Sequence, residues 1–281
     1  MISREQGAGH NEQKLKFLSL SLIALILAAS CSTLAFVDST PIEPEWQSLS
    51  SGVGFFHGKI DSPHLEFWAL RIDLNAPDVG IVIKSDAGTV SNFVRNNNLI
   101  AGINASPYDE NRRNIGLVIS GGTMLNNPVS RYDALVFYKD GLPHRAAIVS
   151  QADIFTTANI ENAVGGYHKI LADGQPTQRT FNEGTVSAQR HPRSAAGVSA
   201  DGSILYLLVI DGRRPGSAGA TELETALLLR ALGSHEGLNL DGGGSSTLAI
   251  RYPDNTVRTV NTPGGIGRER VVAGCIGIII H

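Results

Sequence analysis

Short apolar runs separated by glycine-containing turns limit most strongly how this chain can fold. Glycine makes up 31 of the 281 residues, which favours frequent turns and close backbone approaches over long helices. Runs that alternate, or that are wholly apolar over a few residues, predict β-strands. The predicted strands cover residues 65–72, 79–83, 99–104, 115–120, 134–138, 195–199, 204–210, 237–240, 247–251 and 271–280.

Few helices are indicated. Thr221 and Glu224 have the T-x-x-E spacing of a capping box, leucines follow at helical spacing, and Gly233 supplies a C-terminal stop. A shorter helix is predicted over residues 89–97. No repeat or linker interrupts residues 51–281. We therefore expect an α+β fold, a single domain built on a large mixed β-sheet with few helices.

The first thirty residues have the pattern of an export signal. Lys14 and Lys16 precede an apolar run over residues 17–29, which is shorter than the roughly 20 residues that a membrane-spanning helix needs. Small residues directly before Cys31 resemble a bacterial lipobox, with an ordinary cleaved signal as the alternative. The predicted segments are a lipoprotein signal peptide (1–30), a tether (31–50) and a folded domain (51–281).

The charge balance and the predicted export signal restrict the partners. Lys and Arg number 23 against 26 acidic residues, a net charge of −3, so there is no basic excess to neutralise a phosphate backbone. We expect no nucleic-acid partner. A lipid on Cys31 would anchor the exported protein to a membrane of the bacterial cell envelope.

The densest candidate site lies at residues 239–247. Asp241 ends an apolar strand, and Gly242, Gly243 and Gly244 allow a backbone path that aims N–H groups at an anion. The alternative is a tight hairpin in which the aspartate forms the turn. The P-loop, G-x-G-x-x-G and G-x-S-x-G patterns are missing from the sequence.

Two further clusters combine charges with strand ends. His191 and Arg193 belong to a basic cluster, residues 190–194, whose guanidinium groups could hold an oxyanion; the alternative is a solvated surface. Asp211 and Arg213 follow the predicted strand 204–210. They could serve a site or pair with each other across a turn.

These segments occur together in the phosphodiester glycosidase family, which the sequence resembles in their order and spacing over most of residues 100–280. One stretch departs from the family pattern. Where the family commonly has N-G-G-F-F, this chain has Asn104-Ala105-Ser106-Pro107-Tyr108, so both glycines are lost. The change concerns the substrate more than the fold. The matching stretches are residues 163–166, 171–174, 190–195, 209–213, 221–224 and 239–246.

The resemblance implies an enzyme that hydrolyses sugar-1-phosphodiesters of envelope or extracellular glycans at the anomeric carbon. Because the leaving phosphate monoester is weakly basic, one carboxylate beside cationic groups can suffice. The implied roles are catalysis for Asp241, with Asp211 as the second candidate; phosphate binding for Arg193 and Arg213; a sugar pocket lined by Asn104 and Tyr108; and proton donation or structural support for His191.

We expect no cofactor, although a divalent cation remains open. Asp211, Asp241 and Asn104 are hard oxygen ligands suited to Ca²⁺ or Mg²⁺, but no metal-binding loop or zinc motif is present in the sequence. Two other functions also remain open. One is a non-catalytic glycan-binding envelope lipoprotein that uses the same pocket. The other is a phosphodiesterase that attacks phosphorus, which would normally need a pair of metal ions.

Overall fold

The computed structural model describes residues 42–141, 145–182 and 184–281, and Ile42–His281 form one compact unit. The predicted signal peptide, Cys31 and most of the predicted tether lie outside the described residues. Strand β1 (Gln47–Ser50) occupies the end of the tether segment, so regular structure begins before residue 51. Within the described ranges, no helix is long and apolar enough to cross a bilayer.

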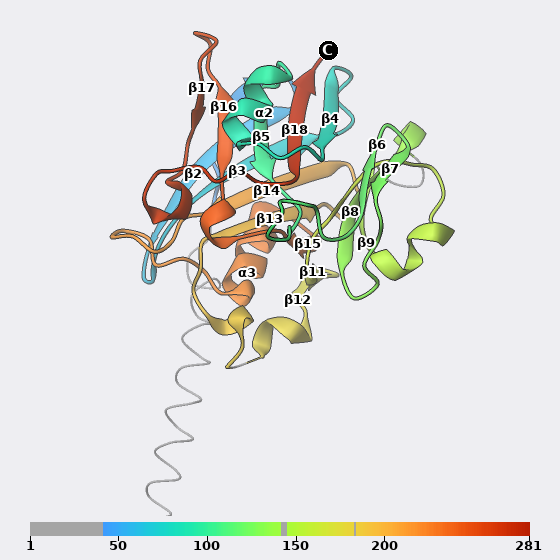
Figure 1. The fold of residues 1–281 in the computed structure, drawn as a ribbon. Helices are drawn as coiled ribbons and strands as arrows, with labels where there is room; N and C mark the ends of the chain where they lie inside the picture. Colours follow the sequence, from blue (N-terminus) through green and yellow to red (C-terminus); the bar gives the residue numbers. More distant parts are fainter. Residues whose placement is uncertain (1–41, 142–144, 183) are drawn as a thin grey trace, which may run out of the picture. The chain divides into compact units, whose positions relative to one another are not determined.

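Three β-sheets contain most of the regular secondary structure of this unit (Figure 1). The first sheet has the order β1, β2 (Val53–Asp61), β3 (His64–Asp73), β14 (Ile204–Ile210), β13 (Arg193–Val198), β15 (Glu236–Asn239), β11 (Lys169–Ala172), β12 (Gln175–Pro176). The second has the order β7 (Thr123–Asn126), β6 (Val118–Ser120), β10 (Ile160–Gly165), β8 (Asp133–Tyr138), β9 (Ala146–Ser150). The third has the order β17 (Val257–Thr259), β16 (Leu248–Arg251), β5 (Ala101–Asn104), β18 (Cys275–Ile280), β4 (Val79–Lys84).

The predicted single mixed sheet is wrong, because neighbouring strands in all three sheets run antiparallel. Strand β14 illustrates the reason. Its continuous apolar sequence is typical of parallel strands buried on both faces. Here an antiparallel strand is buried in the same way: Leu205 and Leu207 face the main core, while Tyr206 on the opposite face approaches Gly233 at the end of a helix. The protein is mostly β, with few helices.

Both predicted helices are confirmed. Helix α2 (Val90–Asn96) starts at the N-cap Thr89, and α3 (Glu222–Leu232) has both hydrogen bonds of the predicted capping box and a left-handed Gly233 at its C-terminus. Helix α3 lies beside β13 and β15 (Figure 1). Glycines permit this approach, because a Cβ atom at Gly237 would lie 2.9 Å from a Leu229 methyl group.

One apolar core joins the three sheets. It includes Leu70 and Leu207 from the first sheet, Leu135 from the second, and Ile103 and Ile276 from the third. Because the first and third sheets share this core, the ends of β5, β13 and β15 come close together. Short 3₁₀ turns connect the strands: η1 (Lys139–Gly141), η2 (Gln151–Thr156), η3 (Gln178–Phe181), η4 (Val186–Ala188), η5 (Gly243–Ser245) and η6 (Pro263–Gly265).

Candidate active site

The segment after β15 crosses from the first sheet to the third. Strand β15 ends at Asn239 in the first sheet, whereas β16 starts at Leu248 in the third, so the segment between them is not a hairpin. The Asp241 N–H donates to the Ala105 carbonyl over 2.9 Å. This bond places Asp241 where the two sheets meet.

The three glycines allow close packing at this crossing. Gly243 has a φ of +64°, which favours glycine. A Cβ atom at Gly242 would lie 2.9 Å from the Pro192 oxygen, and one at Gly244 would overlap the Arg270 guanidinium. The Gly243 N–H donates to the Pro192 carbonyl over 2.8 Å. That donor is therefore not presented to an anion as the sequence suggested.

Asp241 borders a cavity of about 780 Å³, which is the size of a small-molecule site. Its walls come from β13, β15, the start of α3 and the turns η3 and η4. The lining residues are Tyr132, Tyr167, His168, Arg179, Thr185, Val186, Ser187, Gln189, His191, Pro192, Arg193, Arg213, Glu222, Asn239, Leu240, Asp241, Gly242 and Gly243.

One oxygen of the Asp241 carboxylate lacks a hydrogen-bond partner among the described residues. That oxygen is Oδ2, which is buried. Tyr108 Oη lies 3.0 Å from Ser245 Oγ, and either hydroxyl can be the donor. Burial raises the pKa of Asp241 to about 6, opposed by Ser245, Arg270 and Arg112.

Arg213 and His191 place a cation and a neutral imidazole side by side on the cavity lining. The Arg213 side chain is exposed, and its Nη2 lies 3.3 Å from His191 Nδ1. Since a guanidinium only donates, Nδ1 accepts and the neutral imidazole carries its proton on Nε2. Burial, Arg193 and Arg213 all lower the pKa of His191, which favours that neutral form.

Arg193 lines the cavity, but its guanidinium is mostly occupied by protein groups. Nε donates to the Ala220 carbonyl, and Nη2 donates to the carbonyls of Val186 and Gln189, over 2.9–3.2 Å. Nη1 lies 3.6 Å from Glu222 Oε1. The side chain is 5% exposed. Its observed role is to hold the η4 wall against the start of α3, and little of its donor capacity remains for a phosphate.

Asn104 ties the two sheets together and does not line the cavity. Its Oδ1 accepts from Ser194 Oγ and the Thr247 N–H, and its Nδ2 donates to the Asp241 carbonyl, over 2.6–3.0 Å. Its side chain is fully buried. Tyr108 also stands behind the site, through Ser245. Neither residue of the predicted sugar-lining pair is among the residues that line the cavity, and Asn104 instead holds the Asp241 carbonyl.

Asp211 is 1% exposed and lies outside the cavity lining. Its carboxylate accepts from Arg214 Nε (2.8 Å), Asn261 Nδ2 (2.9 Å) and the Thr262 N–H. Arg214 also pairs with Glu66 on β3. The carboxylate thus fixes the loop that carries Arg213.

Sequence reasoning missed several lining residues. Glu222 was not singled out in the sequence, yet it is buried and lines the cavity together with Asn239. Tyr132 and Tyr167 lie edge to face, with ring centroids 5.6 Å apart. Burial and then the Asp241 charge raise the pKa of Tyr167 to about 12, so its hydroxyl stays protonated. No local pattern marks such residues, because they meet only through the fold.

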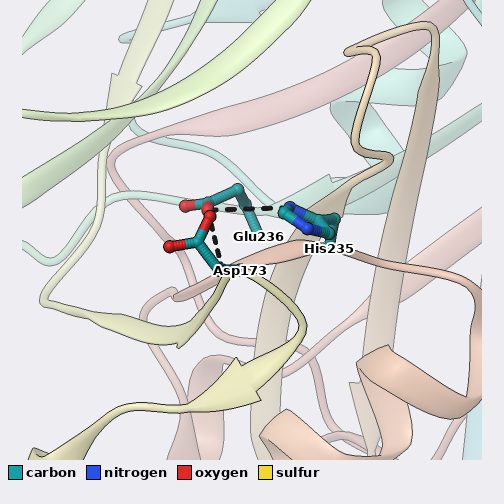
Figure 2. A group of neighbouring side chains, drawn as sticks. All are labelled: Asp173, His235 and Glu236. Atoms are coloured by element: carbon teal, nitrogen blue, oxygen red, sulfur yellow. Dashed lines mark hydrogen bonds and ion pairs between the residues drawn. The ribbon is translucent and has the colours of Figure 1, made fainter.

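Two of the oxygen ligands considered for a metal already accept hydrogen bonds, namely Asn104 Oδ1 and Asp211 Oδ1. A different group has metal-ligand chemistry at the other end of β15: Asp173, His235 and Glu236, with potential ligand atoms within 4.8 Å of one another (Figure 2). Lys169 Nζ already pairs with Glu236 Oε2 at 2.5 Å. That ion pair occupies one of the oxygens a cation would need.

Comparison with known protein families identifies the class of protein. The family model for phosphodiester glycosidase matches residues 97–279, and the chain belongs to that family. The catalytic domain of zebrafish N-acetylglucosamine-1-phosphodiester alpha-N-acetylglucosaminidase, auto-inhibited by its pro-peptide, has a similar fold. It superposes with a TM-score of 0.62 at 18% identity, covering 85% of this chain and 87% of that one.

Two further proteins are similar to the chain. A hypothetical protein from Synechocystis superposes with a TM-score of 0.64 at 15% identity, over 85% of this chain and 64% of the other. The SPbeta prophage-derived uncharacterized protein YomE of Bacillus subtilis strain 168 is 28% identical over 174 residues. That match covers 59% of this chain and 27% of the relative, so the chain spans about a quarter of its length.

Proposed function

We propose that the protein hydrolyses sugar-1-phosphodiesters, with Asp241 as the carboxylate that acts at the anomeric carbon. The observation that carries this proposal is the buried, unpartnered Asp241 Oδ2 in a cavity of about 780 Å³. With a pKa of about 6, Asp241 is mostly ionised at pH 7. The carboxylate then either attacks the carbon or removes a proton from an attacking water.

Arg213 and His191 take the phosphate side of the proposed reaction. The guanidinium and the Nε2–H of the neutral imidazole are donors on one wall. As the bond between the anomeric carbon and oxygen breaks, the electron pair remains on the phosphate oxygen, where these donors stabilise it. A phosphate monoester is a weakly basic leaving group, so this arrangement needs no strong general acid. Arg193 and Asp211 become positioning residues in this proposal.

We further propose that the protein is exported and lipid-anchored through Cys31. Support comes from the apolar run over residues 17–29 after two lysines and from the small residues before Cys31. A Cys31→Ser variant should lose its membrane fraction and become soluble. Unchanged membrane association would contradict the lipid anchor without affecting the proposed chemistry.

The Asp241→Asn variant tests the catalytic assignment. Turnover of a panel of sugar-1-phosphodiesters should fall about a hundred- to ten-thousandfold. The folded protein should become more stable at pH 7, by up to about 3 kcal/mol, because a carboxyl whose pKa is raised from 3.8 to about 6 destabilises the fold when it ionises. Calorimetric melting and sugar release measure the two effects.

The control and the contrary outcome use the same substrates. Glu236→Gln removes a carboxylate outside the cavity and should leave turnover near normal. A folded Asp241→Asn protein with ordinary turnover would remove Asp241 from the mechanism. Recovery of activity on adding Ca²⁺ or Mg²⁺ would assign it the role of a metal ligand.

A further inference from the structure

Two residues that line the cavity each carry a buried acceptor oxygen without a donor among the described residues. Glu222 and Asn239 are 5% and 4% exposed, and both line the cavity. Glu222 Oε2 and Asn239 Oδ1 are buried without a hydrogen-bond partner among the described residues. Buried oxygens of this kind are unfavourable unless something supplies donors.

The orientation of the Asn239 amide follows from its neighbour. Asn239 Nδ2 donates to Glu222 Oε1 over 3.2 Å. A carboxylate only accepts, so the amide nitrogen faces Glu222 and Oδ1 faces away as an acceptor. The two free oxygens therefore belong to one connected pair of side chains, at the junction of β15 and α3.

The Glu222 charge already has a counter-ion, because Arg193 Nη1 lies 3.6 Å from Oε1. The pair thus lacks hydrogen-bond donors rather than a positive charge. This favours neutral hydroxyl groups over an ammonium group as the missing partners. Tyr132 and Tyr167 on the same cavity lining offer apolar faces against which a sugar ring can pack.

We infer that Glu222 and Asn239 form a hydroxyl-binding subsite for the sugar ring and select glycosyl groups that present free hydroxyls to it. The inference rests on the proposed function, since it assigns the sugar end of the same cavity. Acylated or methylated oxygens at those positions bring no donor and leave the two acceptors unpaired, so such sugars are disfavoured.

Binding measurements on the full mature protein test this subsite without requiring turnover. The probes are methyl glycosides of common hexoses and their monodeoxy analogues, titrated by NMR against wild type and Glu222→Gln. The variant keeps an acceptor for Asn239 but loses the carboxylate. Its dissociation constant for the preferred glycoside should rise about ten- to a hundredfold. Glu236→Gln, with the same chemical change outside the cavity, should bind like wild type.

The deoxy analogues show whether the contact is direct. Removing the hydroxyl that meets Glu222 should weaken binding to wild type, with little further loss in Glu222→Gln, because the two changes remove one interaction. Independent, additive losses would overturn the inference, as would equal affinity of wild type and variant, or no glycoside binding to wild type. If Glu222→Gln does not fold, Glu222→Asp carries the same comparison. Hydrolysis that is lost only in Asp241→Asn would leave the proposed function standing whatever Glu222 does.

Discussion

At the scale of single residues, Asp241 and Arg213 border the same cavity in opposite electrostatic settings. Asp241 is held in a poorly solvated corner, which raises its pKa to about 6. Arg213 is exposed, with His191 Nδ1 as its observed side-chain neighbour. A substrate that carries a neutral ring and an anionic phosphate matches this division. In the proposed mechanism, the chemistry therefore depends on a buried carboxylate with a raised pKa and on an accessible cation.

The pH profile reports the role of Asp241. If the ionised carboxylate is the active form, kcat/KM should fall about tenfold for each pH unit below about 6 and stay level above it. His191 should not limit the alkaline side, because its pKa is lowered and it already works as a neutral donor. Initial rates from pH 4 to 8 measure the profile. Activity that declines above pH 6 would make Asp241 the acid instead.

Arg213 and Arg193 should respond differently to replacement by lysine. Arg213→Lys keeps the charge but loses the planar fork, so kcat/KM for diesters should fall about tenfold or more at unchanged stability. Arg193→Lys breaks hydrogen bonds to three backbone carbonyls and should mainly lower the melting temperature. If Arg213→Lys lowered kcat/KM equally for an uncharged aryl glycoside, that result would count against a role of Arg213 in phosphate binding.

At the scale of elements, the sequence predicts what is local. Thr221, Glu224 and Gly233 predict helix α3, because their capping interactions are made at the ends of the helix itself. Strand direction depends on partners far along the chain: β14 pairs with β3, well over a hundred residues earlier. The antiparallel pairing was therefore not predictable from the runs alone. Neither was the crossing after β15, which resembled a hairpin in sequence.

The loop after β14 offers a test of positioning. Asp211→Asn breaks the buried pair with Arg214 and should destabilise the protein by about 3 kcal/mol. Arg213 then loses its fixed loop, so KM for diesters should rise more than kcat falls. Steady-state kinetics and denaturant unfolding measure both effects. A stable variant without turnover would instead make Asp211 the catalytic carboxylate, the second candidate from the sequence.

At the scale of the whole molecule, the site exists because two sheets share one core. The positions of Asp241 and of the basic cluster beside strand ends were predictable, because each belongs to a recognisable motif. The roles of the individual residues were not predictable. The Arg193 guanidinium donates to backbone carbonyls, and the Asn104 amide makes hydrogen bonds where the two sheets meet. Glu222 lines the cavity because α3 packs beside β15, where Asn239 Nδ2 donates to its carboxylate. Such contacts between residues far apart in the chain cannot be predicted from a local sequence pattern.

The boundary of the folded unit predicts how truncation acts. A chain that begins at Ile42 should fold and turn over substrate like the longer mature chain. A chain that begins at Ser51 loses β1 and Trp46, whose ring centroid lies 5.9 Å from that of Phe56 and 6.4 Å from that of Tyr206. It should be less stable by about 2–3 kcal/mol. Equal unfolding midpoints would show that β1 contributes nothing.

Hydrolysis in water labelled with heavy oxygen tests the central claim most directly. The purified mature protein is incubated with a sugar-1-phosphodiester, and the phosphate monoester it releases is analysed by mass spectrometry. Attack at the anomeric carbon breaks the bond between carbon and oxygen, so the label should enter the sugar and leave the phosphate product unlabelled. Attack at phosphorus would put the label into the phosphate of the product, whether that product is the released monoester or sugar-1-phosphate. Such labelling would contradict a glycosidase mechanism.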